Sequence, residues 1–392
     1  MNSKRLATIL ALVLPSFMYG LYRFSVGVLV PGLEAVYSVN DATAGLVISA
    51  SVCAVGLGVI GSGVLAQRYG DVKVILAGFL LFSFPMAAIV VSNSLVVFSL
   101  LFLLASFGSG LMITPSYGLA AAMFPQRKGF AVSFVTSGYN FSGFIGPSAA
   151  GYLLTSYGWG APFAGFAVIG LLFFFVFIAV LGKGVRSAAV SPLGTFSQLL
   201  RTRVIRVLAV AAFFADFGFL VYLSWAPKFL LSSFGAGGVS TTTIDTIFGF
   251  GLGLGGLGTL AGGNLFDRIG GRKSATVAGV LPAIALIGVF VAGSFQLAIV
   301  FVLLTGIFGN MFWSLITVMC QVSVPEDRRT AATSVVQTAG FAGAFLGPGI
   351  AGAIGGPVST VLILTSAVPF IVLALVVAFL YRDPARASPP RT

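Results

Sequence analysis

Apolar stretches of about 20 or more residues recur along the whole chain, and each is long enough to cross a hydrocarbon layer of about 30 Å as one helix. Short charged or Gly- and Pro-rich segments separate these stretches. The composition agrees, because a chain that is 58% hydrophobic and 8% charged has too little polar surface for a water-soluble globule. We therefore expect an all-α membrane protein in which no stretch is left over for a soluble domain.

The breaks divide the chain into twelve predicted transmembrane helices, six in each half. Those of the first half span residues 6–30, 43–66, 74–92, 95–122, 130–156 and 161–182. Those of the second half span residues 204–231, 243–266, 275–292, 295–322, 331–354 and 360–381. The predicted domains are an N-terminal six-helix bundle at 1–182, a linker at 183–203, a C-terminal six-helix bundle at 204–381 and a tail at 382–392.

The linker carries apolar residues at helical spacing beside basic ones. This pattern is typical of an amphipathic helix at the membrane surface, although a plain tether fits it equally well. The residues concerned are Leu193, Phe196, Leu199, Leu200, Arg201 and Arg203.

The distribution of positive charge predicts the orientation in the membrane. If the loops alternate between two sides, all 21 Lys and Arg residues except Arg23 and Lys228 fall on the side of the N-terminus, the linker and the tail. Cytoplasmic loops carry such an excess. We therefore expect a multi-pass protein of the cell membrane with both termini in the cytoplasm. The first apolar run continues to about Val30 without a small-residue cleavage site, which favours a retained helix over a signal peptide.

The two halves repeat each other at an offset of about 200 residues. Gly63-Val-Leu-Ala-Gln-Arg-Tyr-Gly-Asp-Val-Lys73 aligns with Gly263-Asn-Leu-Phe-Asp-Arg-Ile-Gly-Gly-Arg-Lys273, directly after the second helix of each half. Gly-Pro in the fifth helix of each half aligns as well, and we expect Pro147 and Pro348 to bend their helices. Parallel repeats of this kind place a substrate between the halves near the midplane.

These repeats resemble the major facilitator superfamily, whose loop between the second and third helices carries Gly-x-x-x-Asp-Arg-x-Gly-x-Arg/Lys. The resemblance implies a transporter of two pseudo-symmetric six-helix bundles, in which this motif helps to latch the halves in one conformation. The second half keeps the motif at Gly263, Asp267, Arg268, Gly270, Arg272 and Lys273. The first half keeps Gly63, Arg68, Gly70 and Lys73 but has Gln67 at the Asp position, so the resemblance implies a weaker latch there.

A narrower resemblance concerns the first and seventh helices. Tyr22-Arg23 with Ser25 and Pro31, and Tyr222-Leu-Ser-Trp225-Ala-Pro227-Lys-Phe-Leu230, are similar to the organic-anion branches of the superfamily, the anion:cation symporters and the sugar-phosphate permeases. This resemblance implies that Arg23 contacts the anionic group of the substrate, with Tyr22 and Tyr222 in the same site. In those branches an acidic residue often stands at the position of Tyr22.

Two ionisable residues, Arg23 and Asp216, lie about mid-depth in the first and seventh helices. A charge there costs about 2.5–3.5 kcal/mol on insertion scales, so both side chains should face the protein interior. One interpretation is a structural ion pair between the halves. We favour a functional one, since the planar Arg fork suits a carboxylate or phosphate. Asp216 would then release Arg23 when substrate arrives, or hold a coupled proton; the sequence is compatible with both roles.

Further polar residues lie at mid-span in helices one, five, ten and eleven, which line the cavity in the resembling family. Each could contact substrate or form a hydrogen bond between helices. They are Tyr19, Asn140, Asn310, Trp313 and Gln337.

The leading functional hypothesis is a secondary transporter that moves a small organic anion, a carboxylate or a phosphorylated compound, by alternating access. A multidrug or cationic-compound exporter with Asp216 as cation site is an alternative, although Ser106-Phe-Gly108-Ser-Gly110 lacks the Arg motif that export branches usually carry in the fourth helix. A non-transporting membrane sensor on the same scaffold is a third hypothesis.

Several other classes are not expected. The chain has no His, no nucleophile elbow and no metal-ligand cluster, so we expect neither an enzyme nor a metal or organic cofactor. The net charge of +12 does not indicate nucleic acid, because the basic residues lie in short loops. The expected partners are the substrate, lipid and a coupling proton or sodium ion, and we expect a monomer.

Overall fold

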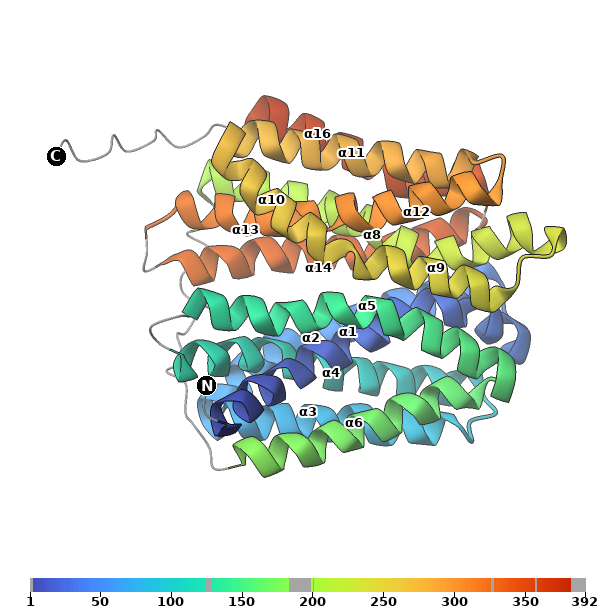
Figure 1. The fold of residues 1–392 in the computed structure, drawn as a ribbon, viewed down its shortest axis with the longest axis horizontal. Helices are drawn as coiled ribbons and strands as arrows, with labels where there is room; N and C mark the ends of the chain where they lie inside the picture. The colour runs from blue at the N-terminus through green and yellow to red at the C-terminus, as the bar shows by residue number, and fades with distance from the viewer. Residues whose placement is uncertain are drawn as a thin grey trace.

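The computed structural model describes residues 3–124, 128–182, 199, 201–325, 328–356 and 358–381. Throughout these residues the chain is helical, and its two halves lie side by side as separate bundles (Figure 1). Eleven of the described segments are long and apolar enough to cross a membrane, and α5 (Lys128–Tyr157) is the twelfth long helix of the arrangement. The predicted all-α fold of twelve helices is therefore confirmed.

The first half consists of six continuous helices. α1 is longer than predicted, because it passes through Pro31 and ends seven residues beyond the expected end at Val30. Proline weakens a helix at one hydrogen bond without forcing it to stop when neighbouring helices support it. The helices are α1 (Ser3–Tyr37), α2 (Asp41–Tyr69), α3 (Asp71–Ile89), α4 (Leu95–Met123), α5 and α6 (Gly160–Leu181).

In the second half, three of the six predicted helices are interrupted. The bounds are α8 (Arg203–Phe234), η2 (Gly235–Gly237), α9 (Thr241–Gly253) with α10 (Gly255–Ile269), α11 (Gly271–Val291), α12 (Phe295–Gly309) with α13 (Met311–Val322), α14 (Arg329–Ile354), and α15 (Ser359–Leu362), the π segment η4 (Ile363–Ala367) and α16 (Val368–Leu380). Each interrupted pair or trio still forms one candidate membrane span, at Thr241–Ile269, Phe295–Val322 and Ser359–Leu380, as predicted at 243–266, 295–322 and 360–381.

Two of these interruptions have a local cause. The α9–α10 break at Leu254 lies within the glycine-rich run 249–256, and glycine is a weak helix former. At the α12–α13 break, the Asn310 side-chain amide donates a hydrogen bond to the Gly306 carbonyl at 2.9 Å. A side chain that bonds the backbone in this way competes with the regular helical pattern.

Other predicted features have mixed outcomes. Pro147 and Pro348 lie inside α5 and α14, which both continue through them, so the expected bends stay predictions. Leu199 is buried and Arg201 and Arg203 are exposed, whereas Leu193, Phe196 and Leu200 of the predicted linker helix lie outside the described residues. The tail from residue 382 also lies outside them.

The same turn occurs at equivalent places in the two halves. Gly70 and Gly270 each end one helix and begin the next, with φ of 88° and 81° and ψ of 150° and 168°. Essentially only glycine adopts this backbone region, so the motif glycines are required by geometry. The structure thus repeats the 200-residue periodicity of the sequence.

We distinguish the two ends of the bundle by the position of the N-terminus. The proximal face is the end at which α1 begins, on the left of Figure 1, and the distal face is the end at which α1 and α8 end. The main contacts between the halves are those of α2 with α14, α5 with α9, and α1 with α8. These three helix pairs position every site discussed below.

The turn geometry leads to a stability prediction. Gly270→Ala should destabilise the fold by about 1–3 kcal/mol, because alanine is strained in this backbone region. The measurement is the apparent melting temperature of the purified protein in detergent, which should fall.

Gly263→Ala is the matched control in the same motif. It is helical and an added Cβ meets nothing within 4 Å, so its melting temperature should be unchanged or higher. Equal melting temperatures for the two variants would contradict the argument.

Candidate functional site

Arg23 lies on α1 within a cluster of tyrosines. Its guanidinium is 5.9 Å from the centroid of the Tyr19 ring, and it lies near the Tyr139 side chain on α5. The Tyr19 and Tyr139 rings stack on each other with centroids 5.5 Å apart. Tyr139 is therefore a part of the site that the sequence interpretation missed, although it directly precedes the predicted residue Asn140.

Asp216 faces Arg23 from the other half. It lies on α8, is 6% exposed, and packs against Gly340 of α14 beside the indole of Trp313. Arg23 and Asp216 influence each other electrostatically, but the ion pairs among the described residues do not include one between them within 4.0 Å. The interpretation as a closed structural ion pair is thus not the arrangement seen. The two charges face each other across the boundary between the halves.

A small cavity of about 10 Å³ lies beside Arg23 between the two halves. Its wall combines residues of α1 and α2 with residues of α8, among them Tyr22, Ser51, Leu220 and Ser224. Because both halves contribute to this wall, a molecule held there would contact both of them. The geometry therefore supports the predicted location between the halves.

Two predicted substrate contacts, Tyr22 and Tyr222, are buried against other helices. The Tyr22 hydroxyl shares a hydrogen bond of 2.7 Å with the Ser106 hydroxyl of α4. Tyr222 is 0% exposed, its ring lies 5.4 Å from that of Phe248, and its hydroxyl has no hydrogen-bond partner. As substrate contacts, both stay predictions.

The remaining predicted polar residues do not gather at Arg23. Asn140 on α5 is buried and faces Gly256 of α10, whereas the Asn310 amide bonds within its own helix. Gln337 is exposed on α14. Of the predicted set, Arg23, Tyr19, Asp216 and Trp313 are thus the residues that the structure brings around one boundary.

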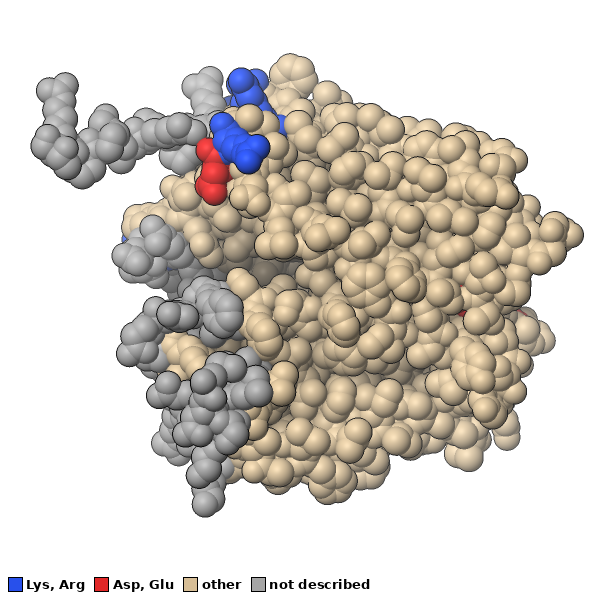
Figure 2. Space-filling view, viewed as in Figure 1, with Lys and Arg blue, Asp and Glu red and all other residues tan. Residues whose placement is uncertain are grey.

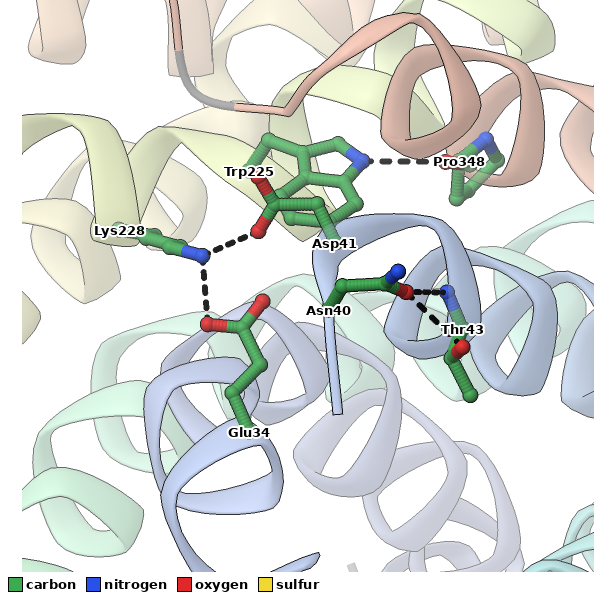
Figure 3. Close-up of polar contacts among 7 residues, drawn as sticks. All are labelled: Glu34, Asn40, Asp41, Thr43, Trp225, Lys228 and Pro348. Atoms are coloured by element: carbon green, nitrogen blue, oxygen red, sulfur yellow. Dashed lines mark hydrogen bonds and ion pairs between the residues drawn. The ribbon is translucent and has the colours of Figure 1, made fainter. Parts of the chain in front are cut away.

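A second charged cluster lies at the distal face (Figure 3). Lys228 of α8 donates to Glu34 Oε2 of α1 at 2.5 Å and to Asp41 Oδ1 at the start of α2. We call Lys228, Glu34 and Asp41 the distal clasp. It links the second half to two helices of the first. The sequence interpretation missed it because Glu34 and Asp41 fall in the loop that was expected after Val30.

Close helix packing continues from the distal clasp toward the middle of the bundle. The Trp225 indole N–H donates to the Pro348 carbonyl at 3.2 Å (Figure 3). The Gly349 N–H donates to Ser49 Oγ at 2.8 Å. On the other side of the boundary, Gly143 lies against the backbone of α9. The distal face is therefore closed.

The repeated motif lies at the opposite end of the bundle. Arg68 and Asp267 are exposed, and the Arg68 guanidinium lies over the ring of its neighbour Tyr69 at 5.3 Å. Figure 2 shows the surface recessed between the halves at this proximal end. The latch role of the motif stays a prediction.

Comparison with known proteins identifies the family. The model described as "Major Facilitator Superfamily" matches residues 12–295 and 208–392. The 4-hydroxybenzoate transporter PcaK of Pseudomonas aeruginosa is 30% identical over 145 residues, which are 36% of this chain and 32% of the relative. PcaK of Pseudomonas putida is 28% identical over 181 residues, 46% of this chain and 40% of the relative. The matched regions thus span less than half the length of these relatives.

Solved structures agree in fold. A bacterial homolog to the human lysosomal transporter Spinster superposes with a TM-score of 0.77 at 18% identity, covering 97% of each chain. The D-xylose-proton symporter superposes with a TM-score of 0.76 at 16% identity, covering 97% of this chain and 99% of that one. Together with the family match, this confirms the resemblance stated from the repeats: the chain belongs to the major facilitator superfamily of integral membrane transporters.

Proposed function

We propose that this transporter moves a small organic anion by alternating between a distal-closed and a distal-open state. The observation that carries the proposal is the position of Arg23. Arg23 lines a small cavity to which both halves contribute, and no carboxylate is ion-paired with it among the described residues. A planar guanidinium in such a position can donate two hydrogen bonds to a carboxylate or phosphate.

The surroundings of Arg23 favour a carboxylate attached to an aromatic ring. Tyr19 and Tyr139 form a stacked pair at the guanidinium, and Trp313 lies near Asp216 on the facing half. Aromatic side chains bind aromatic ligands by stacking and edge contacts. The two PcaK relatives transport 4-hydroxybenzoate, according to their names, which supports testing this class of anion first.

Asp216 is suited to balance the charge of Arg23 when the site is empty. A buried guanidinium without a counter-charge is costly, and an anionic substrate would replace Asp216 as its partner. Displacement of Asp216 by substrate also provides a way to couple binding to proton uptake. We keep Asp216 as the proposed coupling residue at the substrate site.

The positive charge of the loops supports an orientation with the proximal face in the cytoplasm of a cell, including both termini. In that orientation the distal face is outside, and the closed distal clasp corresponds to a state that faces inward. We propose that a single copy of the chain carries out the cycle, since the pocket takes its wall from the two halves of one chain.

The first test is uptake of labelled anions into proteoliposomes, with a panel of aromatic carboxylates, aliphatic dicarboxylates and sugar phosphates. Wild type should show saturable uptake of at least one class, and Arg23→Ala should reduce uptake at least tenfold, because a hydrogen bond to a charged group contributes about 1.5–3 kcal/mol.

Arg23→Lys is the control that keeps the charge but loses the planar fork, and it should retain part of the activity. Normal anion uptake by Arg23→Ala would refute the assignment of Arg23. Transport of organic cations that is abolished by Asp216→Asn, without anion transport, would favour an exporter.

A second test concerns the distal clasp. Lys228→Met leaves Glu34 and Asp41 as two like charges without their cation, so the distal-closed state should lose about 1 kcal/mol or more of its stability. The measurement is the alkylation rate of a cysteine that replaces Ser148, which faces Gly249 across the closed boundary, in a variant without Cys53 and Cys320. The rate should rise several-fold.

Lys228→Arg preserves the positive charge and should keep alkylation slow. The clasp would have no role in distal closure if Lys228→Met and wild type reacted at the same rate, or if the Arg variant reacted as fast as the Met variant.

A further inference from the structure

Asp245 is a buried carboxylate at the boundary between the halves. It lies one turn into α9, is 2% exposed, and packs against Gly151 of α5, where an added Cβ would overlap the carboxylate. Neither of its oxygens forms a hydrogen bond or ion pair within the described part of the chain. Neither the transport site around Arg23 nor the distal clasp uses this group.

The pseudo-symmetry of the fold relates Asp245 to Asp41 of the first half. The α2–α14 boundary and the α5–α9 boundary are related by the repeat, and each has an aspartate near the distal start of its helix, Asp41 and Asp245. Asp41 lies against Gly352 of α14 and against Gly356, which follows the end of that helix, and is paired with Lys228. Asp245 occupies the corresponding boundary without any cation.

No side chain on the neighbouring elements compensates Asp245. The helices packed against α9 are α5, α12, α8, α1 and α10, and α12 carries no charged or titratable residue. The charged or titratable residues that the other four place in their distal parts are Tyr152, Tyr157, Tyr222, Lys228, Glu34 and Tyr37. The charged residues of the same helices at the proximal end, such as Asp267, lie at the far side of the bundle.

A carboxylate in these surroundings cannot easily keep its charge. Moving an ionised carboxylate out of water without a partner costs several kcal/mol even after relaxation, and such a group neutralises itself by taking up a proton. The carboxylate can keep its negative charge when α5 and α9 separate at the distal end. Water then reaches Asp245, and an exposed carboxyl gives up its proton above about pH 4.

We propose that Asp245 is a proton-binding site that is filled when α5 and α9 close at the distal face and emptied when they part. The ligand is a single proton that is exchanged with the water on the distal side. The proposal rests on the alternation between distal-open and distal-closed states stated under Proposed function, and it is independent of which substrate is carried.

The direction of the pH effect follows from linkage. The closed state binds one proton more than the open state, so raising the distal pH favours opening, with at most a tenfold change in the open-to-closed ratio per pH unit. The distal clasp predicts the opposite sign, because protonation of Glu34 at low pH removes its attraction to Lys228. The sign of the pH dependence therefore shows whether Asp245 or the distal clasp controls opening of the distal face.

The experiment measures the distance between spin labels at two exposed distal positions, one in each half, by pulsed electron paramagnetic resonance in nanodiscs. Val91, which is 78% exposed, and Ala236 are replaced by cysteine in a chain without Cys53 and Cys320. Between pH 5 and pH 9, the long-distance population of the otherwise wild-type chain should grow as pH rises. Asp245→Asn, a neutral replacement of similar shape, should abolish this growth and keep the short distance.

Asp216→Asn is the comparison for the other buried carboxylate, and it should keep the pH dependence. If Asp245→Asn does not fold, Asp245→Ala serves the same purpose, because it too removes the titrating group. A wild-type distance distribution that does not change with pH would overturn the proposal, as would an equal pH dependence in the Asp245 variant. The proposal would also be overturned if the distance distribution changed when NaCl replaced choline chloride and did not change with pH.

The spin-label measurement needs no substrate, so it separates this inference from the proposed function. A pH-dependent opening that requires Asp245 would support the proton site even if the anion panel showed no transport. Anion uptake that requires Arg23, together with pH-independent distances, would support the proposed function and refute the proton site.

Discussion

The structure depends on how two helical bundles meet without water. In lipid the helices satisfy their own backbone hydrogen bonds, so each bundle is stable as a unit and little apolar driving force remains to join the two. The joining is achieved by close backbone contact at α2–α14 and α5–α9 and by one lysine that holds two carboxylates of the opposite half. A boundary with so few strong polar links can open without unfolding either bundle.

Charge is placed along this boundary in three different ways. At the distal face Lys228 is fully committed to Glu34 and Asp41, whereas near the pocket Arg23 and Asp216 face each other without a close ion pair. Asp245 has no partner among the residues that the structure describes. The paired charges of the distal clasp hold the halves together. Arg23, Asp216 and Asp245 lack a close ion-pair partner and are therefore able to bind a solute or a proton from solution.

Much of this architecture is readable in the sequence, because long apolar runs and a repeated glycine motif are strong local signals. The predicted helices and the importance of Gly70 and Gly270 come from such signals. The missed features depend on three-dimensional neighbours. The helix passes through Pro31 and brings Glu34 to Lys228, and Tyr139 is significant only because α5 packs against α1 beside Arg23. No spacing rule within one helix reports which residue of another helix it will meet.

The glycine contacts across the boundary have a consequence for the ease of the transport cycle. Gly45, Gly143 and Gly352 meet the opposite half largely through backbone atoms. Glycine has no side chain whose rotamers must be frozen, so closing these surfaces orders few degrees of freedom and opening them releases few. The free-energy difference between the closed and the open boundary therefore changes little with temperature.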